Sequence, residues 1–183
     1  MCAGQFEKEN HFVIEKFTFD LVAPEVREKL ILVKADMELR EHIVLKLLAY
    51  LLFYDPRLKV ECSVDMHYKP DLVIPGEHGV PELWIDCGQV AVKKVESLSA
   101  KLKSSRVIIL KETKREMESF KKVIEKKVQH FDRVEYLSFE KGFVSGLAQA
   151  LERVNEWTLY EVMENVIGVA LNKQGIFEST LYR

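Results

Sequence analysis

The fold of this chain is decided by the stretch Glu82-Leu83-Trp84-Ile85-Asp86-Cys87-Gly88-Gln89 and by the elements that flank it. The apolar run from Leu83 to Cys87 predicts a short strand. Asp86 lies near the end of this strand, and a buried carboxylate needs a cationic partner or a metal ion. We therefore take Asp86 as the first candidate for a functional residue.

A helix and two further strands are expected before this stretch. The strands are predicted at 58–64 and 71–74, separated from their neighbours by turn-forming sequence. The helix is predicted from Met37 to about Tyr54, with Asp36 as its N-cap and Pro56 ending it. Its apolar residues recur at helical spacing: Val44, Leu47, Leu48, Leu51 and Leu52.

Helices and apolar strands alternate after this stretch. A stripe of apolar residues predicts a helix over 91–102, and the very apolar segment 107–110 predicts a strand buried on both faces. A helix over 117–128, a strand at 134–139 and a short helix at about 142–153 follow. This alternation predicts an α/β fold with a partly parallel sheet covered by helices.

Both ends of the chain are expected to be rich in strands. The alternating segment 17–21 and the segment 30–33 predict a hairpin with a long loop. Two closing strands are predicted over 157–171, and a last strand from Ile176. We expect a single domain over 1–183, in which a core of helix, three strands, helix and strand carries accessory strands from both ends.

The composition is that of a globular protein, with 48% hydrophobic and 31% charged residues. The longest apolar stretch, 43–54, is shorter than the ~20 residues that a membrane-spanning helix needs. The polar segment 1–10 lacks the apolar region of a signal peptide. We expect a cytoplasmic protein without membrane contact, flexible only near 1–10. The cysteines show no ligand-like spacing and are expected to be free thiols: Cys2, Cys62 and Cys87.

The charge is unevenly distributed along the chain. The formal net charge is -2, but 12 Lys or Arg stand against 5 Glu between Lys93 and Lys127. These basic helices are a possible surface for DNA or RNA. The plainer interpretation is that Lys-rich helices expose a solvated outer face.

Two aspartates are expected to meet at one edge of the sheet. Asp71 follows Pro70 at the start of one strand, and Asp86 lies near the end of the next. If these strands pair as a hairpin, the two carboxylates converge, and with the carbonyl of Cys87 they would suit Mg²⁺ or Mn²⁺. Each acid also has an ordinary interpretation, Asp71 as a turn residue and Asp86 as the partner of a nearby lysine.

These residues carry a resemblance to known families. Pro70-Asp71 followed by Asp86-Cys87-Gly88 resembles the PD-(D/E)xK signature of metal-dependent nucleases. The stretch Leu39-Arg40-Glu41-His42-Ile43-Val44-Leu45-Lys46-Leu47-Leu48-Ala49-Tyr50-Leu51, together with 82–89, resembles the YaeQ family over nearly the whole chain. The resemblance implies a restriction-endonuclease-like core with accessory strands from both ends.

The resemblance also implies that a glutamate from the first helix joins the metal site, and Glu41 occupies the matching position. Helical geometry is compatible with this role, because Glu41 precedes Val44, Leu45 and Leu48 by three, four and seven residues and borders the core-facing side. The alternative is a surface carboxylate that stabilises the helix N-terminus.

This chain departs from the nuclease signature at one position. Gly88 stands where the motif has a lysine that helps to position the attacking water and to offset charge on the phosphate. Lys93 or Lys94 from the next helix, or Gln89 as a neutral donor, could replace it. Lys94 lies nearer to the inward stripe of that helix and is preferred over Lys93. It could also be an ordinary boundary lysine.

The sequence therefore predicts a Mg²⁺-dependent phosphodiesterase of nuclease type, with Asp71, Asp86, Lys94 and Gln89 as catalytic candidates. Its rival is an inactive module that keeps the fold and binds nucleic acid or a protein. We assign no role to the histidines, since none has a partner at the spacing of a Cys-His nucleophile or a zinc site. The histidines concerned are His42, His67 and His78.

Overall fold

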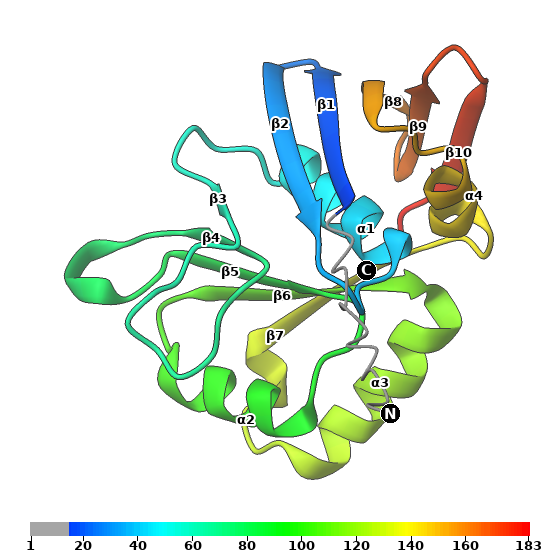
Figure 1. The fold of residues 1–183 in the computed structure, drawn as a ribbon. Helices are drawn as coiled ribbons and strands as arrows, with labels where there is room; N and C mark the ends of the chain where they lie inside the picture. Colours follow the sequence, from blue (N-terminus) through cyan, green and yellow to red (C-terminus); the bar gives the residue numbers. More distant parts are fainter. Residues whose placement is uncertain (1–14) are drawn as a thin grey trace, which may run out of the picture.

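The computed structural model describes residues 15–183, and its elements form four layers (Figure 1). A five-stranded sheet lies at the top of the view, two helices lie beneath it, a second five-stranded sheet follows, and two further helices cover its far side. The expectations for residues 1–10 and for Cys2 lie outside the described residues.

The second sheet, sheet B, contains most of the stretch 82–89. Its strands run in the order β3 (Lys59–Val60), β4 (Leu72–Ile74), β5 (Leu83–Cys87), β6 (Arg106–Thr113) and β7 (Val134–Phe139). The first three strands pair antiparallel, whereas β5, β6 and β7 are parallel. The start of β4 and the end of β5 therefore lie at the same end of the sheet.

The helix α1 (Arg40–Leu52) is packed between the two sheets. Nine consecutive residues, Ile43 to Leu51, are buried, because one side of the helix faces each sheet. A helix that is buried all round belongs to the core rather than to the surface. The position of α1 places its polar residues in the interior, next to the end of β5.

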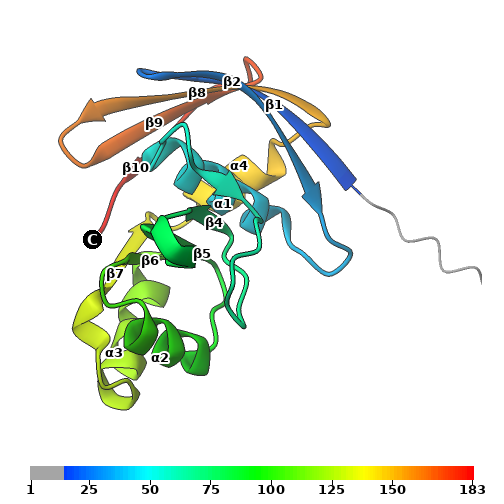
Figure 2. The same cartoon turned by 90° about the vertical axis from the view of Figure 1, so that its left-hand side faces the viewer.

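The other sheet, sheet A, is built from both ends of the chain. Its order is β10 (Ile176–Thr180), β9 (Val166–Leu171), β8 (Val154–Met163), β1 (Glu15–Ala23) and β2 (Val26–Lys34). A parallel pairing of β1 with β8 joins the N-terminal hairpin to the C-terminal strands. The inner face of sheet A packs on α1 and α4 (Phe143–Gln149), as Figure 2 shows from the side.

The far face of sheet B carries α2 (Val92–Lys101) and α3 (Lys114–Lys127). Their apolar residues form a second core with the residues of β5, β6 and β7 that point away from α1. Trp84 belongs to this core, whereas Ile85 and Cys87 face α1. Side chains of a strand alternate between the two faces, so Asp86 lies on the same face as Trp84.

The mixed α/β fold and the order of the elements were predicted correctly, and some details were wrong. The strands β5, β7 and β9 have the predicted bounds or lie within them. The first helix begins at Arg40 with Leu39, not Asp36, as its N-cap, and no side chain caps it. The strand predicted over 58–64 is reduced to β3, the helix predicted to end near Arg153 ends at Gln149, and the N-terminal hairpin turns tightly between Ala23 and Val26.

Short 3-10 turns connect some elements, at Glu77–Gly79 and Phe131–Arg133. The described residues contain no helix long and apolar enough to span a membrane.

Truncation of the sandwiched helix should be costly. Leu48 is fully buried in the core shared by both sheets, so Leu48→Ala should lower the free energy of unfolding by about 2–5 kcal/mol. Leu39 is 69% exposed and supplies the matched control, for which Leu39→Ala should change stability by less than about 0.5 kcal/mol. Urea unfolding followed by circular dichroism measures both values, and equal effects would show that α1 is not the centre of the core.

Candidate active site at the carboxyl end of β5

Asp86 is buried beneath α2 and paired with a lysine. Its side chain is 2% exposed, and Lys94 Nζ donates a hydrogen bond of 2.7 Å to Asp86 Oδ1. Burial raises the pKa of Asp86, and Lys94 opposes this effect. The second oxygen, Oδ2, is buried and has no hydrogen-bond partner among the described residues. The indole N–H of Trp84 also lacks a partner with good hydrogen-bond geometry, and it lowers the pKa of Asp86, so the two buried groups lie close together.

Lys94 is held in place by three contacts. Besides Asp86, its ammonium donates to the backbone carbonyl of Lys69 at 2.9 Å and lies 5.5 Å from the ring centroid of Trp84. Lys93, the neighbouring candidate, is exposed. The structure thus brings Lys94 and not Lys93 to Asp86, which is the placement that helical geometry predicts.

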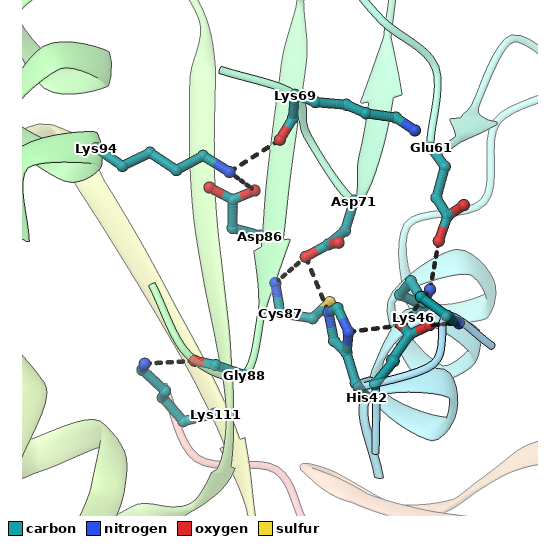
Figure 3. A network of polar contacts seen from close by, with 12 residues as sticks. His42, Lys46, Glu61, Lys69, Asp71, Asp86, Cys87, Gly88, Lys94 and Lys111 are labelled. Atoms are coloured by element: carbon teal, nitrogen blue, oxygen red, sulfur yellow. Dashed lines mark hydrogen bonds and ion pairs between the residues drawn. The ribbon is translucent and has the colours of Figure 1, made fainter. Parts of the chain in front are cut away.

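Asp71 lies just before β4 and reaches across to the end of β5. The backbone N–H of Cys87 donates to Asp71 Oδ2 at 2.7 Å, and the N–H of Asp71 donates to the carbonyl of Ile85 at 3.1 Å. Adjacent strands thus carry Asp71 and Asp86 to the same end of sheet B, and Figure 3 shows Asp71 linked to Cys87 and His42 and Asp86 linked to Lys94. The proximity of Asp71 contributes to the raised pKa of Asp86.

His42 of α1 contacts Asp71 from the other side. His42 Nε2 lies 3.2 Å from Asp71 Oδ2, an ion-pair distance without the geometry of a hydrogen bond. Its Nδ1 lies 2.7 Å from Glu38 Oε1. Burial lowers the pKa of His42, but the two carboxylates outweigh this effect and raise it to about 9. His42 is therefore a cation at neutral pH, a role that the sequence did not indicate.

Lys46 extends this network into the core. Its side chain is 1% exposed, and its ammonium lies 2.6 Å from Glu38 and also contacts Glu61. Burial disfavours the charged form, but the two glutamates raise the pKa of Lys46. The pKa of Glu38 falls to about 2, because His42 and Lys46 outweigh the effect of burial.

Glu61 adopts a left-handed backbone conformation with φ of 50°, which is uncommon for a residue with a side chain. Its backbone N–H donates to the carbonyl of Asp71 at 2.7 Å while its carboxylate contacts Lys46. Glu61 therefore joins the strand end that carries Asp71 to the helix that carries Lys46. The i, i+4 spacing of Glu38, His42 and Lys46 is the one sequence signal that could have found this network.

Lys111 is a second buried lysine at this end of the sheet. It is 5% exposed, donates to the carbonyl of Gly88, and lies 3.9 Å from the ring centroid of Phe120. Burial lowers its pKa to about 8, against the opposing effect of Glu116 and Asp86. Lys111 lies in β6 directly after the apolar run 107–110. Its position next to this buried run was the sequence signal that could have identified it.

The remaining candidates line a cavity of about 290 Å³ beside Gly88. Glu41 and Gln89 belong to its lining, together with Glu112 and Glu116, and Glu41 forms no hydrogen bond or ion pair with the described residues. Burial and the neighbouring glutamates raise the pKa of Glu112. The backbone N–H of Cys87 donates a hydrogen bond to Asp71. The thiol of Cys87 is buried, and this burial raises its pKa.

Among residues 15–183, no three His, Cys, Asp or Glu side chains are grouped closely enough to hold a metal ion. A divalent ion here would depend on two carboxylates, backbone oxygen and water. Mg²⁺ accepts such a set, because it keeps several waters and often binds only one or two carboxylates. Asp86 could offer such an ion only Oδ2, because Oδ1 accepts from Lys94, and the indole N–H of Trp84 lies near the same carboxylate.

The comparisons with known proteins agree in one family. The family model described as YaeQ protein matches residues 27–177. The crystal structure of the YaeQ protein from Xanthomonas axonopodis pv. citri is similar with a TM-score of 0.70 and 18% identity, covering 93% of this chain and 96% of that chain. The YaeQ protein from Pseudomonas syringae has a TM-score of 0.66 and 21% identity, covering 93% and 94%. No curated protein matches the chain.

The raised pKa of His42 predicts a pH-dependent contribution to stability. A group whose pKa rises from 6.5 to about 9 on folding stabilises the protein fully below pH 6.5 and loses this contribution as the pH rises through 9. The difference in unfolding free energy between wild type and His42→Gln should therefore be constant below pH 6.5 and shrink towards pH 9. The exposed residue His67 provides the control, since His67→Gln should show no such trend. Urea titrations over this range measure it, and a difference independent of pH would contradict the charge assigned to His42.

Proposed function

We propose that this chain, which belongs to the YaeQ family, is a metal-dependent phosphodiesterase of nuclease type with an altered PD-(D/E)xK site. The family name states no activity, so the function must be inferred from the site. The order α1, β3, β4, β5, α2, β6 supports a restriction-endonuclease-like core. Membership of the family indicates the fold, and the proposed hydrolysis rests on the residues at the end of β5.

One observation carries the proposal. Asp71 and Asp86 come from adjacent strands to the same end of sheet B, and the ammonium of Lys94 lies 2.7 Å from Asp86 (Figure 3). Two acids and a lysine are the groups that the nuclease signature requires. Here the lysine comes from α2, which follows the motif position, instead of from position 88 itself.

Asp71, Asp86 and the backbone carbonyl of Cys87 would hold Mg²⁺ or Mn²⁺, and Glu41, from the wall of the adjoining cavity, would contribute through water. The ion would polarise a phosphodiester and lower the pKa of a bound water. Asp71 is oriented for this role by the N–H of Cys87, which binds Oδ2 and leaves Oδ1 without a hydrogen bond from the described residues.

The basic groups around the acids would act on the phosphate. Lys94 would help to place the attacking water and offset charge as it develops on the phosphate. Lys111 adds a second ammonium beside Gly88, the position of the missing motif lysine. Gln89, exposed at the cavity, would donate a neutral hydrogen bond to the water.

Removal of one acid should abolish the ion site. Asp86→Asn should weaken Mn²⁺ binding by about 100-fold or more, because loss of even an indirect metal contact costs roughly 10–100-fold. Isothermal titration with MnCl₂ measures the affinity, and Asp65→Asn, at an exposed position, is the control.

Lys94→Gln should reduce the rate of cleavage of labelled DNA and RNA with Mn²⁺ by about 100-fold and leave Mn²⁺ binding in place. Lys93→Gln is the control and should change neither the cleavage rate nor Mn²⁺ binding. Wild type that binds no Mn²⁺ would refute the proposal.

A second candidate is a non-enzymatic module that binds nucleic acid. It is favoured by the pairing of each aspartate with a cation of the protein, Asp86 with Lys94 and Asp71 with His42, and by Gly88 at the lysine position. The basic helices α2 and α3 would then provide the binding surface.

This candidate predicts binding without cleavage. Wild type should retard DNA or RNA in a gel shift in a salt-dependent manner, because displaced counterions weaken the complex as salt rises. Replacing the exposed lysines Lys122, Lys126 and Lys127 with glutamine should reduce both the affinity and the salt dependence. Replacement of Lys16, Lys29 and Lys59, which lie on other elements, is the control. Retardation that survives the first triple substitution would exclude this surface.

A further inference from the structure

The strand β7 ends sheet B and leaves an open edge on the side away from the candidate active site. Its N–H and C=O groups at Ser138 pair antiparallel with Tyr182, at 3.0 and 2.9 Å. Backbone groups of a strand alternate in direction, so Val134 and Tyr136 present their N–H and C=O groups to the same edge. The N–H of Val134 donates to the carbonyl of Phe131, whereas the C=O of Val134 and both backbone groups of Tyr136 have no backbone partner at this edge among the described residues. Figure 2 shows the C-terminus close to β7.

A groove of about 340 Å³ follows this open edge. Its walls come from elements on both faces of the sheet: Phe53 follows α1, Lys121 belongs to α3, and Leu181 lies in the C-terminal segment. The volume is at the lower end of the ~300–1,000 Å³ that is usual for ligand pockets. We refer to this feature as the β7 groove.

The β7 groove carries unpaired positive charge. Arg106 is neutralised by Glu135, through two hydrogen bonds of 2.7 and 2.8 Å. Lys121 and Arg183 also line the groove, and neither pairs with a carboxylate of the described residues. Among the described residues, Arg183 donates a hydrogen bond only to the amide oxygen of Asn165, at 3.2 Å. The groove thus combines two available cations with apolar side chains such as Phe53 and Leu181.

Tyr136 gives an independent indication that a ligand belongs here. It lines the groove and is 7% exposed, yet its hydroxyl is buried and has no hydrogen-bond partner among the described residues. A buried hydroxyl usually has a partner. The backbone of the same residue also has unpaired groups on the open edge, so Tyr136 combines free main-chain groups with a buried hydroxyl that lacks a partner among the described residues.

From these observations, we propose that the β7 groove binds an extended acidic peptide segment of a partner protein, which adds to sheet B as a strand beside β7. The free C=O of Val134 and the free N–H and C=O of Tyr136 would pair with the main chain of the peptide, and this mode of recognition is known as β-augmentation. Lys121 and Arg183 would pair with its carboxylates. Phe53 and Leu181 would cover alternate apolar side chains.

The long free edge of β2 in sheet A does not share these features. The first half of β2 carries three consecutive charged residues of alternating sign, Arg27, Glu28 and Lys29. Charged side chains on an edge strand discourage its pairing with a further strand. The edge of β7 is short, but it lies in a walled groove with charge of one sign. The docking strand is therefore β7.

The probe is a fluorescein-labelled octapeptide of alternating glutamate and valine, and fluorescence anisotropy measures its binding to the full chain. Saturable binding is expected. The same peptide with lysine in place of glutamate, and one N-methylated at alternate amides so that it cannot pair as a strand, should not bind. Lys121→Glu should weaken binding by about tenfold or more, whereas Lys122→Glu, on the exposed surface of the same helix, should not.

Amide hydrogen exchange tests the strand pairing directly, because attraction between charges alone would not protect backbone N–H groups from exchange. The N–H of Tyr136 should exchange more slowly with the peptide bound, whereas the N–H of Val134, which already donates to Phe131, should change little. Absence of binding up to millimolar peptide, or binding that leaves the Tyr136 amide unprotected, would overturn the proposal. Sedimentation showing that two copies of the chain pair through β7, with Lys121→Glu separating them, would overturn it too, because a second copy would then be the occupant.

Discussion

The burial of α1 between two sheets is the constraint on which the rest of the molecule depends. A helix in this position has no side that faces solvent, so any charged residue it carries must find its partners within the protein. Lys46 sits near the middle of α1 and is almost fully buried. Glu38 precedes the helix and Glu61 follows β3, and both bring their carboxylates to this one ammonium. The backbone at Glu61 takes a left-handed conformation at this contact.

The same need for pairing connects the core to the candidate active site. Glu38 contacts His42 as well as Lys46, His42 contacts Asp71, and Asp71 accepts the N–H of Cys87 at the end of β5. One residue earlier on β5, Asp86 pairs with Lys94 on the opposite face of the sheet. Two sets of paired charges thus meet at the end of β5, one reaching from Asp71 into the helix core and the other joining Asp86 to α2. Loss of one partner leaves the other charge buried and unpaired, which strongly destabilises the folded protein. The need to keep these pairs therefore holds the side chains of the site in place.

Local sequence was enough to predict most of the elements and part of the site. Apolar runs and turn residues identified β5, β6 and β7, and helical spacing chose Lys94 over Lys93. The network around Asp71 was missed for a physical reason. His42 and Lys46 meet Asp71 and Glu61 only after α1 packs against sheet B, and such contacts leave no local pattern. The short β3 and the uncapped start of α1 are likewise set by packing, which overrides the propensity of single residues.

The charge state of the site bears on how it could work. Asp71 and Asp86 are each matched by a cation of the protein, His42 and Lys94, so the two acids carry no net surplus of negative charge. A divalent ion between them would therefore compete with these cations, and its binding would have to shift at least one of them. Lys94 is suited to such a shift, because the carbonyl of Lys69 already accepts a second hydrogen bond from its ammonium. An ammonium displaced from Asp86 would remain anchored beside it, close to where a phosphate would lie, so the ion pair of the free protein and the metal site of a working enzyme can be two states of the same residues.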